Sequence, residues 1–469
     1  RRRHTTGARV TGVQTCVLPI FAKVCNGSYH GSEAQAKQEV QSIFTDSRKA
    51  DKGGLFVPIK GARVDAHDFI NQVMEAGALA TLSEKDLGET NFPYIKVESS
   101  LQAVKDIAEF YLKQLEIPVV GITGSVGKTS TKEMIAAVLG QKYNVLKTQG
   151  NFNNELGLPL TVFGLRAEHQ IAVLEMGISD FGEMHRLAKI ARPDTCVITN
   201  IGLCHLEFLK SRDGILKAKT EIFDFLKEDG HVILNGDDDK LVTVTDVKGI
   251  KPVFFGAENK NGIWADKIES KGLKGIECRI HVKDESFKVL VPIPGRHMVY
   301  NALAGTAVGL TYGLTLDEIK AGIESLQSLS GRFHILENEK KNIMVIDDCY
   351  NANPVSMKAS LEVLQDALGR KVALLGDMGE LGKNEVEMHR EVGRFAAEKD
   401  IDVIVCTGTL CKEMAEAAKE TAPEKKVLYF ENREALEDAL DELILPGDSI
   451  LVKASHFMQF EKIVKKLAE

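Results

Sequence analysis

The segment GITGSVGKTS, residues 121–130, decides the fold. It follows an apolar run, Pro118-Val-Val-Gly-Ile, and precedes an amphipathic segment whose apolar positions are Ile135, Val138 and Leu139. A glycine loop between a buried strand and a helix is the setting of a phosphate loop. The loop's backbone N–H groups and the positive end of the following helix form a nest for phosphate oxygens. The sequence therefore predicts a nucleotide site in an α/β sheet.

Two side chains of this loop suit phosphate chemistry. We expect Lys128 to reach the β- and γ-phosphates and the Thr129 hydroxyl to bind Mg²⁺. The spacing GxxGKT is shorter than the GxxxxGKS/T pattern, and the alternative is a glycine turn that carries GKT by chance. The strand and helix on either side favour the phosphate loop. The expected nucleotide contacts in the loop are Thr123, Gly124, Ser125, Val126, Gly127, Lys128 and Thr129.

A carboxylate ends a neighbouring strand of the same predicted sheet. Further apolar strands are expected at residues 171–174, 195–199 and 231–234, with amphipathic segments between them, which indicates a parallel sheet covered on both faces. Glu175 follows the first of these strands, and ligands bind at the carboxyl ends of such strands. Alone it would be a solvated rim residue; after a phosphate loop we expect it to bind the Mg²⁺ of the nucleotide.

The length of 469 residues corresponds to about three domains at roughly 150 residues each. Residues 21–115 are expected to form a small N-terminal α/β domain, and residues 116–328 a central phosphate-loop ATPase-like domain with a mostly parallel sheet. Residues 252–293 carry short alternating runs and predict an antiparallel excursion within it. Residues 329–469 alternate strands and helices again, which predicts a C-terminal doubly wound, Rossmann-like domain. The fold class is therefore α/β with three domains.

The composition narrows the function classes. With 44% hydrophobic and 27% charged residues, the chain has enough apolar material for several cores. A formal charge of -8 gives no general electrostatic case for binding nucleic acid. No apolar run approaches the roughly 20 residues that span a bilayer. Eight cysteines without a CxxC pair indicate reduced thiols, so we expect a cytoplasmic protein.

The first 20 residues, RRRHTTGARVTGVQTCVLPI, differ from the rest of the chain. They contain four Arg and no acidic residue. A transit peptide would be Arg-rich too, but this stretch lacks a helical apolar face. We therefore interpret residues 1–20 as a non-native or artefactual segment and exclude them from the fold. The charge of residues 21–469 is then -8 - 4 = -12.

Ten segments of the chain resemble the Mur ligases, the ATP-dependent amide-forming enzymes of peptidoglycan synthesis. The resemblance runs in family order from about residue 21 to the C-terminus. The matching segments are TDSR at 45–48, GITGSVGKTS at 121–130, GNFNNELGLP at 150–159, LEMG at 174–177, TNIGLCHLE at 199–207, KAKTEIF at 217–223, GRHMVYNALA at 295–304, GRF at 331–333, DDCYNANPVSM at 347–357 and LGDMGELG at 375–382.

Within the family, the last two segments resemble the member that adds D-alanyl-D-alanine to UDP-N-acetylmuramoyl-tripeptide. The sibling that adds meso-diaminopimelate carries a DNPR motif, which this chain lacks. Two alternatives stay open: a sibling ligase that adds a different amino acid, and a phosphate-loop nucleotide-binding protein without ligase activity. The third residue of the tripeptide, Lys or meso-diaminopimelate, also stays open. We expect a monomer.

The resemblance implies a mechanism and a set of catalytic residues. ATP phosphorylates the substrate carboxylate, and the incoming amine then attacks the acyl phosphate. The resemblance assigns catalysis to Lys128, Glu175, His205 and Lys219, and two Mg²⁺ ions to Thr129, Glu175, His205 and Lys219. The family commonly carries a carbamylated lysine at the position of Lys219, although Lys217 is close by. Without the resemblance, Lys219 would be a solvated helix lysine and His205 a loop residue.

The resemblance also implies contacts with the nucleotide and with the dipeptide. Asn301 matches a position near the adenine, and Arg332 and Asp347 match positions that meet the nucleotide when the third domain closes. The alternatives are a hinge arginine and an aspartate that ends a strand. Asn351 and Asn353 are expected to face the incoming dipeptide, although this segment is also a good turn.

The N-terminal domain is expected to hold the UDP-sugar through Asp46, Ser47 and Arg48. An arginine fork and a hydroxyl suit a diphosphate or a uracil edge. The alternative for each of them is a surface ion pair in a turn. Asn154, with its neighbours Asn151 and Asn153, is expected to supply neutral polar groups beside the substrate.

Overall fold

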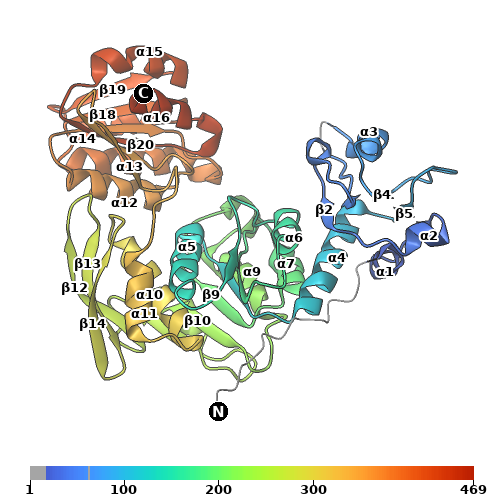
Figure 1. Cartoon of the computed structure of the whole chain (residues 1–469). Coiled ribbons are helices and arrows are strands. Elements are labelled where there is room, and N and C mark those ends of the chain that lie inside the picture. Colours follow the sequence, from blue (N-terminus) through green and yellow to red (C-terminus); the bar gives the residue numbers. More distant parts are fainter. Residues whose placement is uncertain (1–16, 62–63) are drawn as a thin grey trace.

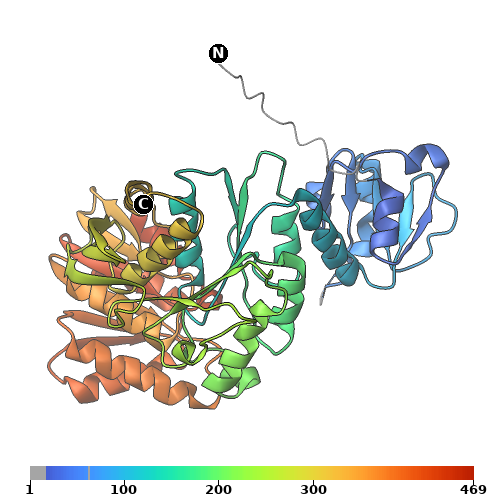
Figure 2. The same cartoon turned by 90° about the horizontal axis from the view of Figure 1, so that it is seen from below.

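Three separate sheets organise the chain, as the computed structural model in Figure 1 shows. The structure describes residues 17–61 and 64–469. Each sheet carries helices, which confirms the predicted α/β fold with three domains. The N-terminal and C-terminal domains lie on opposite sides of the central one in both Figure 1 and Figure 2.

The N-terminal sheet has five strands in the order β1-β5-β4-β3-β2, and only β1 runs antiparallel to its neighbour. The strands are β1 (Ser28–His30), β2 (Ser42–Phe44), β3 (Gly54–Phe56), β4 (Ala80–Ser83) and β5 (Tyr94–Lys96). The helices are α1 (Leu18–Val24), α2 (Glu33–Ala36), η1 (Ser47–Lys49), η2 (Ala66–Phe69) and α3 (Ile70–Glu75). Helices η2 and α3 follow each other directly between β3 and β4.

Helix α1 changes the expectation for the start of the chain. Residues 1–16 lie outside the described residues, but Leu18 and Phe21 are buried in the same core as Leu55 and Val104. Leu18 and Phe21 are three positions apart on α1 and therefore share one face. The described fold therefore includes residues 17–20, which the expected boundary at residue 20 left out, whereas the non-native origin of residues 1–20 stays a prediction. The four arginines before α1 dominate the composition of residues 1–20, so the composition gives no sign of this short apolar face.

Helix α4 (Ser100–Leu115) leads out of the N-terminal domain. The Ser99 side chain caps it by accepting the N–H of Gln102. Its apolar face, which includes Ile107 and Leu112, packs against α6 and α7 of the central domain. Because α4 contacts both domains, it sets the position of the N-terminal domain relative to the central sheet.

The central sheet has nine strands in the order β14-β13-β12-β11-β10-β9-β6-β8-β7. They are β6 (Val119–Thr123), β7 (Val145–Lys147), β8 (Ile171–Glu175), β9 (Thr195–Ile198), β10 (His231–Asn235), β11 (Val253–Gly256), β12 (Ile263–Ser270), β13 (Ile276–Val282) and β14 (Glu285–Val291). Strands β6 to β12 are parallel to their neighbours, and β13 pairs antiparallel with β12 and β14. The excursion over residues 252–293 therefore extends the same sheet, and its first pairing, between β11 and β12, is parallel.

Both faces of the central sheet are buried, as expected for parallel strands. Alternate residues of β6 divide between two cores: Ile122 packs with α5, α10 and α11, whereas Val119 belongs to the core that contains α7 and α9. The helices are α5 (Lys128–Leu139), α6 (Gly157–Val162), α7 (Glu183–Ala191), α8 (Leu206–Leu209), α9 (Arg212–Thr220), η3 (Glu221–Phe223), η4 (Leu241–Thr243), α10 (His297–Thr311) and α11 (Leu316–Glu324).

The C-terminal sheet has six strands in the order β15-β16-β20-β17-β18-β19, with only β15 antiparallel. They are β15 (His334–Asn338), β16 (Ile343–Asp347), β17 (Arg370–Gly376), β18 (Val403–Thr407), β19 (Lys426–Phe430) and β20 (Asp448–Lys453). Strands and helices alternate through this domain, as expected, and the edge strands β15 and β19 are partly exposed. The helices are α12 (Pro354–Gln365), η5 (Gly382–Asn384), α13 (Glu385–Glu398), α14 (Cys411–Thr421), α15 (Arg433–Leu443), η6 (His456–Met458) and α16 (Glu461–Ala468).

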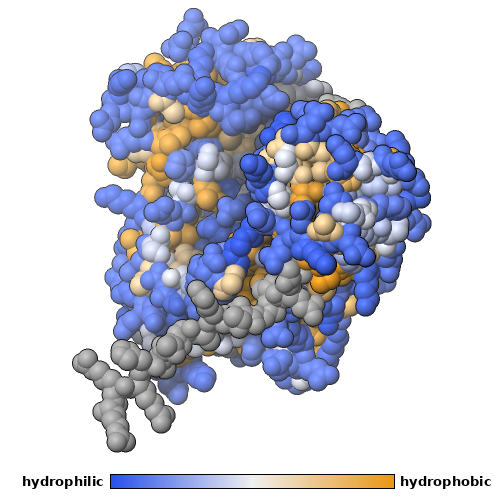
Figure 3. All heavy atoms as spheres, turned by 45° about the vertical axis from the view of Figure 1, so that its right-hand side comes forward, coloured by the Kyte–Doolittle hydropathy of each residue, from blue (hydrophilic) through white to orange (hydrophobic). Residues whose placement is uncertain are grey.

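The surface agrees with the composition. Hydrophilic residues cover most of the face in Figure 3, and apolar residues gather in its recesses. Among the described residues, no helix combines the length and the hydropathy needed to cross a membrane.

Candidate active site

The phosphate loop joins β6 to α5, as predicted, and two of its glycines are required by geometry. Gly127 precedes α5 with a φ of 81°, in the left-handed region that favours glycine. A Cβ on Gly124 would lie 1.9 Å from Thr199 Oγ1. The backbone therefore makes its turn only because neither residue carries a side chain.

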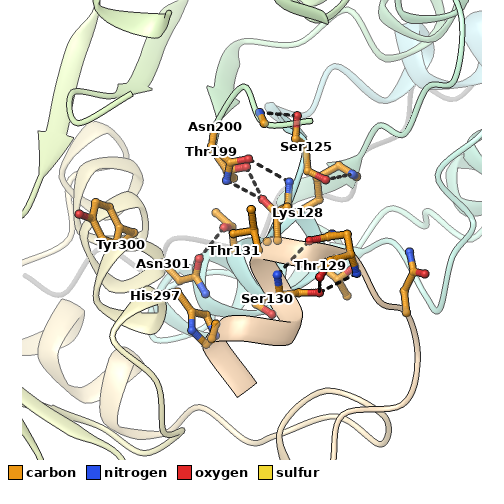
Figure 4. Close-up of a pocket in the computed structure, with 18 of the residues that line it drawn as sticks. Ser125, Lys128, Thr129, Ser130, Thr131, Thr199, Asn200, His297, Tyr300 and Asn301 are labelled. Atoms are coloured by element: carbon orange, nitrogen blue, oxygen red, sulfur yellow. Dashed lines mark hydrogen bonds between the residues drawn. The ribbon is translucent and has the colours of Figure 1, made fainter. Parts of the chain in front are cut away.

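Two residues after β9 clamp this loop, and the sequence did not assign them to the site. The Asn200 amide donates to the Val126 carbonyl at 2.9 Å, and its oxygen accepts the Val126 N–H at 3.0 Å. Thr199 Oγ1 donates to the same carbonyl at 2.7 Å. Figure 4 shows both side chains close to the loop. They lie in the family segment TNIGLCHLE, which was the available signal.

Lys128 and Thr129 begin helix α5. Lys128 Nζ donates to the Gly124 carbonyl at 2.8 Å, so its ammonium is folded back over the loop. Thr129 is buried at the floor of the site. The Thr123 hydroxyl, at the end of β6, is buried without a hydrogen-bond partner in the described part of the chain. Thr123 and Gly124 do not line the cavity themselves, whereas residues 125–131 do.

Glu175 ends β8 beside the loop, as predicted, and is almost completely buried. Its Oε1 accepts the Asn153 amide at 2.8 Å, and its N–H donates to Thr148 Oγ1 at 2.9 Å. Its Oε2 has no hydrogen-bond partner among the described residues and lies 4.0 Å from Lys132 Nζ. This oxygen is the kind of acceptor that a hard cation takes.

Lys132 is a buried cation that the sequence reasoning missed. Its ammonium donates to the Thr148 carbonyl at 2.6 Å and lies 2.9 Å from Glu133 Oε1. Lys147 pairs with the other oxygen of Glu133 from a more exposed position. The spacing of four residues from Lys128 puts Lys132 one helical turn further along α5, and that spacing was the available signal.

Lys219 and His205 form the second part of the expected metal site. Lys219 is 0% exposed, and its Nζ has no hydrogen-bond partner in the described part of the chain. Burial, with a smaller contribution from the charge of Lys128, lowers the pKa of Lys219 to about 7. Burial, followed by the charges of Lys128 and Lys219, lowers the pKa of His205 to about 4. Burial is the main cause of both pKa shifts, and neither His205 nor Lys219 lines the main cavity, so their sharing of one metal site stays a prediction.

A cavity of about 730 Å³ opens between the central and C-terminal domains. This volume is in the range of ligand pockets. The central domain contributes residues 125–131 and 199–202, and the C-terminal domain contributes residues 331–333 and Lys453. The phosphate loop therefore forms one wall of a pocket that is completed by another domain.

Asn301 on α10 lines this cavity, and its contact with a nucleotide stays a prediction. Its Oδ1 accepts the Thr131 hydroxyl at 2.8 Å, which ties α10 to α5, as Figure 4 shows. Asp237 and Tyr300 lie nearby and were not predicted. The Asp237 carboxylate accepts the Tyr300 hydroxyl at 2.9 Å and three backbone N–H groups, including that of Asn259 at 2.6 Å. This carboxylate is thus already satisfied by the protein.

Of the two nucleotide contacts predicted in the third domain, Arg332 and Asp347, only Arg332 lines the cavity. Arg332 lines the cavity, and its guanidinium stacks on the Tyr350 ring at 4.3 Å. Asp347 does not line it: its carboxylate accepts the Gly331 N–H at 2.7 Å, so it acts here as an aspartate at the end of a strand that fixes the interdomain turn. The neighbouring Asp348 faces the cavity and pairs with buried Lys453. A contact of Asp347 with nucleotide stays a prediction.

Some of the asparagines considered for substrate binding line the cavity, and one does not. Asn351 and Asn353 line the cavity, and Asn353 also caps α12 by accepting the Ser356 N–H at 2.9 Å. Asn154 accepts the N–H of Gly157 at 2.8 Å and lies outside the cavity lining, whereas Asn151 and Asn153 line it. Among the three neighbouring asparagines, the structure therefore favours the two that were not assigned individually.

Asp46, Ser47 and Arg48 lie in the N-terminal domain, away from this cavity. Arg48 donates to Asp46 through Nε at 2.9 Å and Nη2 at 2.8 Å, and its side chain is 86% exposed. In this structure the pair corresponds to the surface ion pair in a turn that was the alternative. Its contact with a nucleotide-sugar stays a prediction.

Three family models match the chain in succession. They are described as Mur ligase family, catalytic domain, over residues 39–119, as Mur ligase middle domain over residues 122–309, and as Mur ligase, glutamate ligase domain, over residues 331–456.

Similar proteins extend over nearly the whole chain. The UDP-N-acetylmuramoyl-tripeptide–D-alanyl-D-alanine ligase of Bacillus subtilis is 38% identical, covering 92% of this chain and 93% of that protein. The Escherichia coli protein of the same name is 35% identical, with coverages of 96% and 98%. A crystal structure of MurF from Acinetobacter baumannii superposes with a TM-score of 0.88 at 33% identity, covering 98% of this chain and 100% of that one. The MurF ligase of Thermotoga maritima in complex with ADP gives a TM-score of 0.81 at 30% identity, with coverages of 93% and 98%.

The order of the matched domains agrees with the order of the three sheets, and the matches include the phosphate loop and its completing domain. The chain therefore belongs to the Mur ligase family.

Proposed function

We propose that this protein is the ATP-dependent ligase that joins D-alanyl-D-alanine to UDP-N-acetylmuramoyl-tripeptide in peptidoglycan precursor synthesis. The observation that carries this function is the cavity whose phosphate-loop wall belongs to one domain and whose opposite wall belongs to the next. The full-length relatives carry the name of this activity, and one structural neighbour holds ADP.

The chemistry follows from the weakness of a carboxylate as an electrophile. A carboxylate oxygen of the tripeptide attacks the γ-phosphorus of ATP, which gives an acyl phosphate and ADP. The amine of the dipeptide then adds to the carbonyl carbon, and the tetrahedral intermediate expels phosphate and leaves the amide. The transferred oxygen departs with the phosphate, and the amine loses a proton. Pairing these anions requires cations such as Lys128 close to the phosphates.

The two walls of the cavity explain how water is kept from the acyl phosphate. The phosphate loop binds ATP on the central domain, while Asn351 and Asn353 face the cavity from the C-terminal domain. Bringing both substrates together requires these domains to close, and a closed site excludes water.

The donor groups present fit Mg²⁺. Glu175 Oε2 is buried without a hydrogen-bond partner in the described residues, and the Thr129 hydroxyl lies in the same cavity. Oxygen donors of this kind are what Mg²⁺ requires. When bound, Mg²⁺ neutralises phosphate charge. A second ion is assigned to His205 and Lys219.

Carbamylation of Lys219 would turn this residue into an oxygen ligand. The amine is buried and unpartnered in the described structure, and its pKa of about 7 leaves much of it neutral at physiological pH. A neutral amine adds to CO₂ and releases a proton, which gives the carbamate. The neutral fraction rises as the pH increases through 7, so carbamylation is favoured on the alkaline side.

The remaining assignments complete the substrate scheme. Asp46, Ser47 and Arg48 bind the UDP-sugar in the N-terminal domain, Arg332 and Asn301 contact the nucleotide, and the protein acts as a cytoplasmic monomer. Asp347 meets the nucleotide only after closure, when the turn that it holds can move.

A coupled assay tests this function. The purified protein is given ATP, Mg²⁺, UDP-N-acetylmuramoyl-tripeptide with either Lys or meso-diaminopimelate, and a panel of amines. Among the amines of the panel, we expect only D-alanyl-D-alanine to give phosphate release and a pentapeptide product. Product with another amine would identify a sibling ligase. Nucleotide binding without any product would contradict ligase activity.

A further inference from the structure

Glu380 approaches the expected metal site from the C-terminal domain. It lies in the LGDMGELG segment between β17 and η5 and lines the interdomain cavity. Its Oε2 is 3.3 Å from His205 Nδ1 in the central domain. The contact therefore joins the C-terminal domain to the central domain. The Glu380 side chain is 77% exposed, so it is not part of a hydrophobic core.

Both residues adopt a backbone conformation that side chains rarely occupy. The φ of His205 is 50° and that of Glu380 is 60°, in the left-handed region. Such conformations persist where the surrounding structure imposes them, and they cluster at functional sites. Here the two strained residues face each other.

The loop that carries Glu380 is held rigidly from behind. The Met378 N–H donates to His389 Nε2 at 2.9 Å, and the Gly379 N–H donates to Ser455 Oγ at 2.9 Å. Met378 and Leu381 are buried on either side of Glu380. The loop therefore presents this one carboxylate in a defined place.

A neighbouring cluster supports this loop and is not itself suited to a metal. Asp377, His389 and Cys411 bring ligand atoms within 4.8 Å of one another. However, His389 Nδ1 donates to the Glu385 carbonyl at 2.7 Å while Nε2 accepts the Met378 N–H, so both ring nitrogens are used. Asp377 accepts the Cys411 N–H at 2.7 Å. The cluster fixes the Glu380 loop by hydrogen bonds.

We propose that Glu380 is a positioning residue that orients the His205 ring through Nδ1 and leaves Nε2 to face the metal side. This inference rests on the proposed metal role of His205. Ligating histidines generally present their other ring nitrogen to a carboxylate or carbonyl, and loss of that partner costs about 10–100-fold in metal affinity or activity. Because Glu380 belongs to the C-terminal domain, the second metal site is complete only when this domain lies against the central one.

Mn²⁺ binding measured by electron paramagnetic resonance tests the proposal, with the full-length protein saturated with a non-hydrolysable ATP analogue. We expect Glu380→Ala to weaken the second Mn²⁺ about 10-fold or more and to lower kcat similarly, with KM for ATP within about twofold. Glu380→Gln keeps an oxygen acceptor and should lose less. Glu387→Ala is the matched control, since Glu387 is an exposed glutamate on α13 that pairs with Arg394 of the same helix.

A double-mutant cycle separates this inference from the metal assignment itself. His205→Ala should weaken the second Mn²⁺, and adding Glu380→Ala should cost nothing further, because Glu380 acts through His205. If His205→Ala weakens Mn²⁺ binding and Glu380→Ala does not, the positioning role is wrong and the metal site stands. If His205→Ala leaves both Mn²⁺ ions bound, the metal role of His205 and the role of Glu380 fall together.

Discussion

The phosphate-loop site and the Asp46–Arg48 turn are both charged segments that the sequence assigns to substrate binding, and the structure treats them in opposite ways. Around the phosphate loop, Glu175 Oε2 and Lys219 Nζ are buried without hydrogen-bond partners in the described chain. In the turn, Arg48 and Asp46 satisfy each other in solvent.

This difference in burial and hydrogen bonding indicates that the phosphate-loop site, and not the turn, is arranged to bind a ligand. A buried polar atom without a partner costs free energy, and a protein keeps such an atom where a ligand completes it. An exposed ion pair contributes little because water solvates both partners, so it can exchange one partner for a substrate at small cost. We therefore expect changes around the phosphate loop to reduce the rate of reaction, and changes in the turn to alter only the binding of one substrate.

The largest effect is expected from Lys128→Ala. Removal of the ammonium at the phosphate loop should lower kcat by at least about 10³-fold, because it removes charge stabilisation of the transferring phosphate. Phosphate release that depends on D-alanyl-D-alanine is the measurement. Near-normal turnover would show that Lys128 of the phosphate loop has no role in the reaction. The phosphate loop would then not differ in this respect from the Asp46–Arg48 turn.

Lys219→Ala is expected to lower activity by about 10²-fold, because the oxygen ligand formed by carbamylation is lost. Acetate or another short carboxylate should restore part of the activity by supplying oxygen atoms in the vacated space. Lys217→Ala is the control at the neighbouring lysine. Full activity of Lys219→Ala, or equal losses in both variants, would show that the carbamate assignment is wrong.

Lys132→Met tests whether the buried charges beside the phosphate loop stabilise the central domain, and the measurement is Tm. Removing one partner from a buried charge cluster leaves Glu133 and Glu175 with an excess of negative charge and should cost about 3–5 kcal/mol. This corresponds to a Tm lower by roughly 10 °C for the central domain. Lys147→Met, which removes the more exposed partner of the same Glu133, should lower Tm far less. Equal shifts in the two variants would contradict the importance of burial here.

The smallest effect is expected from Arg48→Ala. The KM for the UDP-linked tripeptide should rise several-fold, while kcat, the KM for ATP and Tm stay close to wild type, because this exposed side chain supports no core. Lys49→Ala is the control on the same turn. A large loss of kcat would mean that the turn takes part in the chemistry, and an unchanged KM would remove it from the substrate site.

The fold was predictable where strands are buried on both faces and apolar runs are continuous, as in β6, β8 and β10. No individual prediction was made for the edge strands β15 and β19, whose residues are partly exposed. The first three residues of α1 fall within the excluded segment 1–20, because the arginines before them dominate its composition, although Leu18 is a core residue. Residues with one solvent-facing side give a weaker pattern, and their pairing depends on distant segments.

The site was predictable where its residues are contiguous or end a strand. Residues 125–129 and Glu175, which line the cavity, belong to this class, whereas Thr123 and Gly124 do not line it. Asn200, Lys132 and Glu380 were not assigned, because their roles come from partners far away in the sequence. The contact of Glu380 with His205 joins two domains, and no local pattern announces it.

The proposed reaction passes through an acyl phosphate formed between the two walls of the cavity, and transfer of an oxygen isotope tests this step. The tripeptide is prepared with both oxygens of its reacting carboxylate labelled with ¹⁸O, and the phosphate released with D-alanyl-D-alanine is analysed by mass spectrometry. If the acyl phosphate forms, each released phosphate carries one ¹⁸O atom and the new amide carries the other. Unlabelled phosphate with both ¹⁸O atoms retained in the tripeptide would contradict it.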